Sequence, residues 1–242
     1  MRNEPTAQTP LTGLVVFDCD GVLVDSETVS ARVLVVMAAD LGLSFTHEEA
    51  LAFLRGRKVA TWVAELEARL DRAIADAFIP AFRSAAASAF ERELEAVPHV
   101  ESALSRIAAP FCTASSAPRE KIRQTLGLTG LLPHFEGRIY SAYEVGHWKP
   151  DPRLFLHAAK DMGAAPQDCI VVEDSLVGVQ AGVAAGMTVL AYAPGDTAPM
   201  LADAGATPFS CMTELPGLLA EWRPGSVLPE NQKTPAPLAV AV

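Results

Sequence analysis

The chain has 242 residues, 50% of them hydrophobic, which is enough for one sizeable core or for a core with a smaller second domain. Its net charge of −10 and its scattered basic residues argue against a nucleic-acid partner, and no run approaches the ~18 apolar residues of a membrane span. Its four cysteines include no CxxC pair, so we expect neither a zinc site nor a disulfide framework, and we expect a cytoplasmic protein.

The first predicted element is a buried strand at residues 14–18, LVVFD, which is short, apolar and rich in β-branched residues. Residues 1–12 before it are polar and predict a flexible leader. Asp25 supplies N-cap chemistry for a helix over residues 27–41. Beyond that helix, apolar residues recur at i, i+3 and i+4, which predicts only further helices, separated at Pro80.

After Val97 the pattern changes to strands that alternate with helices. The predicted strands lie at residues 110–113, 137–145 and 188–193 and at the start of 169–187. Such alternation with short loops indicates an α/β fold with a doubly wound parallel sheet. We expect a Rossmann-like core over 13–26 and 98–223, with an inserted all-helical cap domain over 27–97. Residues 224–242 are rich in Pro and Ala and are predicted to be disordered.

Acidic, hydroxyl and lysine side chains follow the predicted strands where each strand ends. They are Asp18 and Asp20 after the first strand, Thr113 after the second, Glu173 and Asp174 after a later one, and Lys149 in a loop before a helix. Ligands of doubly wound sheets bind beyond the carboxyl ends of the strands, so these side chains should converge. Clustered carboxylates repel one another unless a cation compensates, and hard oxygen ligands favour Mg²⁺ with a phosphate completing its coordination.

The spacing of Asp18 and Asp20 suits phosphoryl transfer. Residues i and i+2 of an extended segment point the same way, so both carboxylates can face one substrate. One carboxylate can attack phosphorus to form an aspartyl phosphate, while the other protonates the leaving alkoxide and then takes a proton from the attacking water. Gly21 allows a sharp turn beside the phosphate. Lys149 can neutralise the transferred group, and Thr113 can donate a hydrogen bond to it.

Taken in order, these motifs resemble those of the haloacid-dehalogenase-like phosphohydrolases. The matching segments are DCDG at residues 18–21, Thr113 in FCTASS, Lys149 in GHWKPDP and Glu173-Asp174 in VVEDSLVGVQAG. Each motif is weak by itself, whereas all four in this order, over about residues 13–215, form a specific signal.

The resemblance implies a role for each of these residues. Asp18 would be the nucleophile and Asp20 the general acid and base. Mg²⁺ would be held by Asp18, the main-chain carbonyl of Asp20 and Asp174, with Glu173 binding it directly or through water. Residues 27–97 would form a mobile cap that closes over the site, as in the phosphoglycolate-phosphatase and β-phosphoglucomutase branch.

Substrate choice is expected to lie in the cap and beside the phosphate. The stretches RELEAV and WKPDPRLFLHAAKDMG are similar to those of sugar-acid phosphatases in this branch, which implies a small phosphorylated sugar or a sugar acid like 6-phosphogluconate. The candidate substrate-binding residues are Gly21, Ala114, Ser115, Arg32, Arg55, Arg57 and Lys58. The basic residues also fit a solvated surface, and Ser115 with Ser116 also fits a helix cap. We expect a monomer with no membrane partner.

Each motif also has a purely structural explanation. DCDG departs from the EF-hand calcium loop because its glycine is fourth rather than sixth. The pair Glu173-Asp174 could cap a helix, and Lys149 could be an ordinary surface lysine. Thr113 could simply fill the end of a strand.

Three other functions fit parts of the pattern. A phosphomutase of the β-phosphoglucomutase type is the main alternative, although that branch carries a histidine and an arginine where this chain has Ser30 and Val59. A 2-haloacid dehalogenase would need neither Asp20 nor the later acidic pair. A catalytically idle binding protein on this fold is disfavoured by the intact set of catalytic residues.

Overall fold

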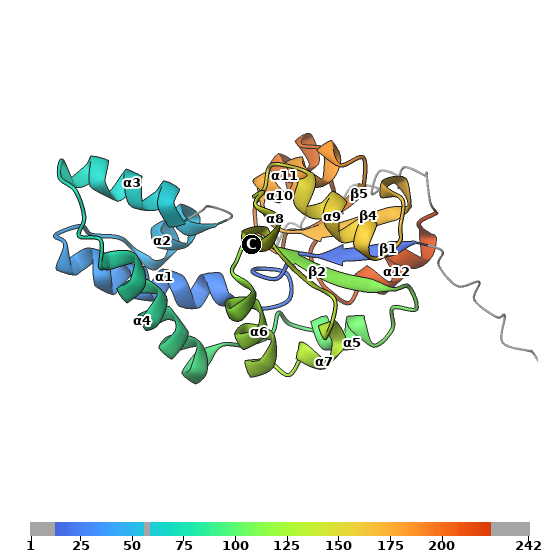
Figure 1. Ribbon diagram of the computed structural model, residues 1–242, viewed down its shortest axis with the longest axis horizontal. Helices are drawn as coiled ribbons and strands as arrows, with labels where there is room; N and C mark the ends of the chain where they lie inside the picture. The colour runs from blue at the N-terminus through green and yellow to red at the C-terminus, as the bar shows by residue number, and fades with distance from the viewer. Residues whose placement is uncertain (1–12, 56–58, 224–242) are drawn as a thin grey trace, which may run out of the picture.

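The computed structural model describes residues 13–55 and 59–223 of the chain. Its core is a six-stranded sheet in the order β3-β2-β1-β4-β5-β6, in which all neighbouring strands are parallel (Figure 1). The strands are β1 (Leu14–Phe17), β2 (Phe111–Ser115), β3 (Ile139–Ser141), β4 (Cys169–Glu173), β5 (Thr188–Tyr192) and β6 (Thr207–Phe209). This confirms the predicted α/β fold with a doubly wound parallel sheet.

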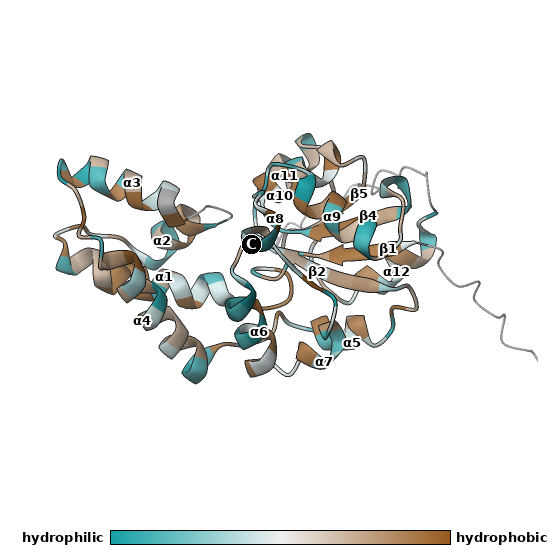
Figure 2. Cartoon of the chain, viewed as in Figure 1, coloured by the Kyte–Doolittle hydropathy of each residue, from teal (hydrophilic) through white to brown (hydrophobic). Residues whose placement is uncertain are grey.

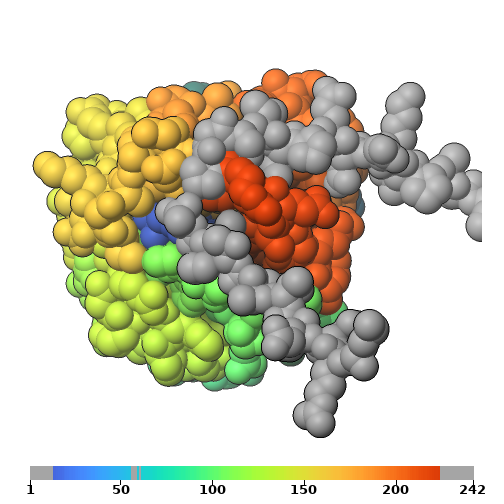
Figure 3. Space-filling view, turned by 90° about the vertical axis from the view of Figure 1, so that its right-hand side faces the viewer, coloured from blue at the N-terminus to red at the C-terminus, as the bar shows by residue number. Residues whose placement is uncertain are grey.

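The sheet is buried on both faces because successive residues of each strand point to opposite sides. In β1, Val15 and Phe17 belong to one hydrophobic cluster, whereas Leu14 and Val16 belong to another. Figure 2 shows the hydrophobic colour along the central strands. Seen from the end of the sheet away from the separate helical group, only a small blue area of the first segment shows between later parts of the chain (Figure 3). Because β1 lies between β2 and β4 in the strand order, the residues that follow it lie near the middle of the sheet edge.

Helices cover the two faces of the sheet. The face that holds Phe17 is covered by α5 (Val100–Leu104), α6 (Arg119–Leu128), α7 (Leu132–Phe135) and α12 (Leu215–Glu221). The opposite face is covered by α8 (Ala142–Val145), α9 (Arg153–Asp161), α10 (Leu176–Ala184) and α11 (Ala198–Asp203). A short 3₁₀ helix, Pro166–Asp168, leads into β4.

A separate group of helices lies to one side of the sheet and has a hydrophobic core of its own (Figure 1). It consists of α1 (Ser26–Asp40), α2 (His47–Leu54), α3 (Val59–Leu70) and α4 (Phe78–Glu93). Trp62 and Phe82 pack at its centre, with ring centroids 5.0 Å apart. The two connecting segments run side by side, since Asp25 N donates to Glu95 O and Val97 N donates to Leu23 O, both at 3.0 Å.

The helical group lies between β1 and β2 in the chain, and we keep residues 27–97 as the proposed extent of the cap and 13–26 with 98–223 as the proposed core. The predicted break at Pro80 is wrong. Pro80 lies in the first turn of α4, where its missing N–H has no intrahelical acceptor. The break falls at residues 71–77, and Asp71 there has a left-handed backbone with φ 51°.

Three further details differ from the prediction. Residues 137–145 form the strand β3 and then the helix α8, whose N-cap is Ser141, rather than one strand. The strand β6 was not predicted. The segment Ser115-Ser116 does not cap α6, because β2 runs through Ser115 and the N-cap position of α6 is Pro118.

All four cysteines are free thiols. No helix within the described ranges 13–55 and 59–223 combines the length and apolar character needed to cross a membrane. The predicted leader at 1–12 and tail at 224–242 lie outside the described residues.

Candidate active site

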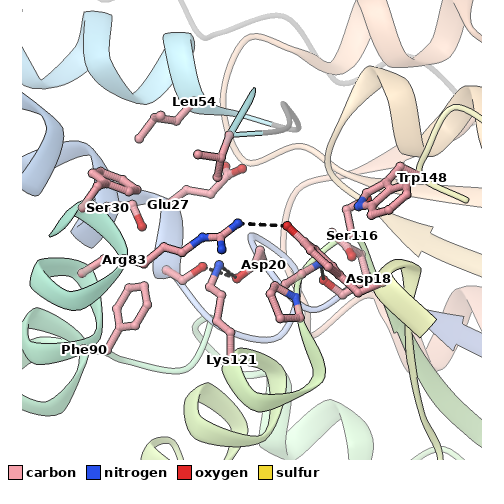
Figure 4. A pocket seen from close by; sticks show the side chains of 18 of the residues that line it. Asp18, Asp20, Glu27, Ser30, Leu54, Arg83, Phe90, Ser116, Lys121 and Trp148 are labelled. Atoms are coloured by element: carbon pink, nitrogen blue, oxygen red, sulfur yellow. Dashed lines mark hydrogen bonds and ion pairs between the residues drawn. The ribbon is translucent and has the colours of Figure 1, made fainter. Parts of the chain in front are cut away.

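A cavity of about 640 Å³ lies between the carboxyl end of the sheet and the helical group (Figure 4). The core side contributes acidic, hydroxyl and lysine side chains from the segments that follow β1, β2, β3 and β4, and the cap side contributes residues of all four helices α1 to α4. Asp18 and Asp174 reach this cavity from neighbouring parallel strands, β1 and β4. The structure thus brings Asp18, Asp20, Lys149 and Asp174 to one cavity at the sheet edge, whereas Thr113 does not line it.

Lys149 links the two acidic segments. Its Nζ donates to Asp18 Oδ1 at 2.7 Å and to Glu173 Oε1 at 2.6 Å, and only 3% of its side chain is exposed. Burial opposes the charge of Lys149, but the two carboxylates outweigh it and raise the pKa of this lysine. Burial also raises the pKa of Asp18 to about 7, although Lys149 acts in the opposite direction. An ordinary surface lysine is thereby excluded at this position.

Glu173 is fully buried, and protein donors occupy both of its oxygens. Oε1 accepts from Lys149, while Oε2 accepts from the main-chain N–H groups of Asp174 and Ser175 and from Ser175 Oγ, each at 2.9 Å. Gly178 makes room for this carboxylate, since a Cβ there would lie 1.9 Å from Glu173 Oε1. These contacts suit Glu173 to hold Lys149 in place.

The residues at this edge have the donor chemistry of a hard cation site. Asp18, Glu173 and Asp174 each offer a carboxylate oxygen, and these oxygens lie within 4.8 Å of one another. Burial, followed by the charges of Glu27, Glu173 and Asp18, raises the pKa of Asp174 well above its ordinary value. Gly21, with φ 81°, lets the chain pass close to this site, because a Cβ there would lie 2.2 Å from Asp174 Oδ2. A divalent cation would compensate the charge that these groups concentrate.

Asp20 has a different set of partners, one of which the sequence analysis missed. Its Oδ1 accepts from Lys121 Nζ at 2.9 Å and from Ser26 Oγ (Figure 4). Burial alone would raise the pKa of Asp20, but Lys121 and Ser26 outweigh burial and lower it. Lys121 lies on α6 and stacks over Phe90 of the cap, with Nζ 5.7 Å from the ring centroid. In the sequence, REK at a helix start is indistinguishable from a solvated turn of helix.

The hydroxyl side chain of β2 that lines the cavity is not the predicted one, Thr113. Thr113 lies inside β2, next to Phe17 in the register, and is fully buried. Its Oγ1 is a buried side-chain polar atom with no hydrogen-bond partner among the described residues. Ser115, two residues further along, ends the strand and lines the cavity. Ala114 packs its side chain into the core on the other face, so any contact with substrate would come from its main chain. The expectation that Thr113 follows the end of the strand is therefore wrong.

The predicted cap residues are placed unequally. Arg32 pairs with Glu93 at 2.9 Å and does not line this cavity, which fits the solvated-surface alternative. Arg55 pairs with Glu27 at 3.2 Å and lines a second, smaller cavity. Arg57 and Lys58 lie outside the described residues.

One basic residue that the sequence analysis did not single out, Arg83 of α4, lines the main cavity. Ser30 and Val59 line it as well, at the two positions where the phosphomutase branch differs. The pattern AFRSAAASAF around Arg83 predicts only an amphipathic helix, so the sequence carries no separate signal for this arginine.

The chain is similar to several known proteins. A model of the haloacid dehalogenase-like hydrolase family matches residues 12–186. The chain is 35% identical to 6-phosphogluconate phosphatase of Escherichia coli K12, over 84% of this chain and 93% of that protein. It is also 35% identical to hexitol phosphatase A of the same organism, over 75% of this chain and 83% of that protein. The structure of a conserved haloacid dehalogenase-like protein of unknown function from Agrobacterium tumefaciens C58 is similar, with a TM-score of 0.78, 33% identity and coverage of 86% and 97% of the two chains.

Proposed function

The chain belongs to the haloacid dehalogenase-like hydrolases and is a phosphatase, and we propose that it hydrolyses a small phosphorylated sugar or sugar acid with Mg²⁺ through an aspartyl phosphate on Asp18. The observation that carries the proposal is the contact of Lys149 with both Asp18 and Glu173 at the cavity floor. This contact places a fixed positive charge against the carboxylate that would attack phosphorus. The relative named for 6-phosphogluconate supports the sugar-acid assignment.

In the first step, a carboxylate oxygen of Asp18 attacks phosphorus and the bond from phosphorus to the sugar oxygen breaks. Lys149 stabilises negative charge on the transferred group, and Ser115, which lines the cavity, would donate a hydrogen bond to it. Asp20 gives a proton to the leaving alkoxide. In the second step Asp20 takes a proton from water, which attacks the aspartyl phosphate and releases inorganic phosphate.

Lys121 influences whether Asp20 acts as an acid or as a base. In the free protein it holds Asp20 charged, which suits a base but not an acid. A phosphate group that enters beside Asp20 brings negative charge that raises the pKa of Asp20 and competes for Lys121. Substrate binding would thus favour the protonated form needed in the first step.

Mg²⁺ would be held by Asp18, Asp174 and the Asp20 main-chain carbonyl. When bound, the ion supplies positive charge that neutralises the phosphate and orients it. Because protein donors already occupy both oxygens of Glu173, we assign Glu173 to an indirect contact with the ion through water.

A phosphomutase of the β-phosphoglucomutase type remains the second candidate. The positions that carry a histidine and an arginine in that branch face the cavity here as Ser30 and Val59. Neither side chain can act as an acid or base near neutral pH, which favours hydrolysis. Incubation with a hexose 1-phosphate separates the two, because a mutase yields an isomeric sugar phosphate and a phosphatase yields free phosphate.

The direct test is phosphate release from a panel that includes 6-phosphogluconate, hexitol phosphates, phosphoglycolate and nucleotides, with Mg²⁺ and with chelator. We expect release that depends on Mg²⁺ and that Asp18→Asn abolishes. Retained turnover in Asp18→Asn would disprove the aspartyl-phosphate mechanism, and full activity in chelator would disprove the metal requirement. Light scattering on the same preparation tests the expected monomer.

A further inference from the structure

Helix α4 presents one face to the cavity, and that face is apolar apart from one residue. Its cavity-lining positions are Ile79, Phe82, Arg83, Ala86, Ala87 and Phe90. The spacing of i, i+3 and i+4 places these side chains on one side of the helix. Arg83 is solvent-exposed and carries the one charged side chain on this face of α4, so its guanidinium is open to a ligand that enters the cavity. Arg83 is therefore a candidate contact for a ligand in the cavity.

Among the residues that the structure describes, the one hydrogen-bond partner of Arg83 is a neutral group. Its Nη2 donates to the hydroxyl of Tyr143 at 3.0 Å, across the cavity from α4 to α8 (Figure 4). Tyr143 packs edge-on against Trp148, with ring centroids 5.2 Å apart, directly before Lys149. No carboxylate among the described residues forms an ion pair with Arg83. Within residues 13–55 and 59–223, its charge therefore has no ion-pair partner.

The two lysines that line the cavity already form ion pairs with carboxylates. Lys149 contacts Asp18 and Glu173, and Lys121 contacts Asp20. Glu27 and Glu120 also line the cavity, so an anionic group on a substrate would be repelled over much of the wall. Arg83 has no ion pair within the described chain, so it is the cation that a second anionic group of the substrate, besides its phosphate, could bind.

We propose that Arg83 determines specificity by binding a carboxylate at the end of the substrate remote from the reacting phosphate, so that the site selects phosphorylated sugar acids over neutral phosphorylated polyols. The inference rests on the proposed phosphatase function. The planar guanidinium matches a carboxylate with two parallel hydrogen bonds, and Tyr143 fixes its orientation from the core side. The phosphate is bound at Asp18 and Lys149 on the sheet edge, whereas Arg83 comes from the cap. The two ends of one short chain would therefore meet different domains.

The test compares 6-phosphogluconate with glucitol 6-phosphate, which has the same six-carbon chain but a CH₂OH group in place of the carboxylate. Wild type should show the higher kcat/KM with 6-phosphogluconate. In Arg83→Gln the ratio of the two kcat/KM values should fall by about 10- to 100-fold, and in Arg83→Lys by less, because lysine keeps the charge but not the fork. Arg92→Gln is the matched control, since Arg92 lies on α4, outside the cavity lining, and donates to Ser88 O of its own helix at 2.8 Å.

An equal loss on both substrates in Arg83→Gln would overturn the inference and assign Arg83 to the phosphate or to cap structure. A wild-type ratio near one would overturn it as well, even if Arg83→Gln does not fold. The absence of phosphate release from every ester with Mg²⁺ would instead refute the proposed function. Release with a ratio that Arg83→Gln and Arg83→Lys leave unchanged would refute only the role of Arg83.

Discussion

Gly178→Ala should inactivate the enzyme by pushing Glu173 away from Lys149. A Cβ at residue 178 would lie 1.9 Å from Cδ and Oε1 of Glu173 and 2.3 Å from Oε2. Ordinary van der Waals contact begins at 3.4 Å, so the carboxylate would have to move by about 1.5 Å. Such a movement would break hydrogen bonds that now measure 2.6 to 2.9 Å.

The magnitude follows from opposing effects. Alanine within a helix is favoured over glycine by about 1 kcal/mol. Overpacking costs about 1–3 kcal/mol, and each lost hydrogen bond to a charged group costs about 1.5–3 kcal/mol. The steric effect dominates, so we expect the free energy of unfolding to fall by about 2–5 kcal/mol. Lys149 would lose its anchor, and a misplacement near 1 Å can lower kcat by roughly 100-fold.

Urea unfolding and phosphate release from the best substrate of the panel measure the two effects. Gly217→Ala is the matched control, because Gly217 also lies in a helix, α12, and a Cβ there would meet nothing within 4 Å. Glu173→Asp combined with Gly178→Ala should recover part of the lost stability, since the shorter side chain relieves the clash. If Gly178→Ala matched wild type in both assays, the steric reasoning would be refuted. If it lost stability but kept full turnover, the role of Glu173 in holding Lys149 would be refuted.

Three other predictions follow from the same geometry. Lys121→Met should raise the pKa of Asp20, seen by carboxyl NMR and as an acidic limb of the kcat profile moved to higher pH; an unmoved limb would contradict the pairing. Thr113→Val should leave activity unchanged and keep the free energy of unfolding equal or raise it by about 1 kcal/mol, whereas Ser115→Ala should lower kcat/KM by about 10-fold. A loss of activity in Thr113→Val but not in Ser115→Ala would show that Thr113 is the hydroxyl that acts on the substrate. Because burial raises the pKa of Asp18 from 3.8 to about 7 on folding, the metal-free protein should lose stability as pH rises between these values. Mg²⁺ should then raise Tm more at about pH 7.5 than at about pH 5, and an equal rise at both would contradict this sign.

The convergence of Asp18, Lys149 and the acidic pair could be predicted because parallel strands end at a common edge, whatever the length of the chain between them. The residue at which β2 ends could not be predicted in this way. The hydroxyl groups of Thr113 and Ser115 lie two residues apart and point to the same face, so the pattern is the same for both. Only the pairing of β2 with β3 shows which residue reaches the edge of the sheet, because it continues as far as Ser115 opposite Ser141.

Lys121 and Arg83 were missed for a different reason. Each lies on an amphipathic helix, where a basic residue is usually solvated. Whether it faces water or a cavity depends on how its helix packs against an element distant in sequence, which local periodicity does not encode. The same dependence explains why Arg32, equally plausible in the sequence, pairs with Glu93 outside the cavity.

The two aspartates of the DCDG segment show what the structure adds to the sequence motif. They are two residues apart, yet each has its own lysine, Lys149 for Asp18 and Lys121 for Asp20, from separate parts of the chain. Their pKa values move in opposite directions, upward for the more deeply buried Asp18 and downward for Asp20. Carboxylates whose environments separate their pKa values can perform different tasks.

For the first step of the proposed reaction, however, the free protein holds both aspartates in the wrong state, because Asp20, which must give a proton, is charged and Asp18, which must attack, is prone to protonation. A divalent cation at Asp18 and a phosphate beside Asp20 would each reverse one of these shifts. The active protonation states would therefore be reached only when metal and substrate are both bound.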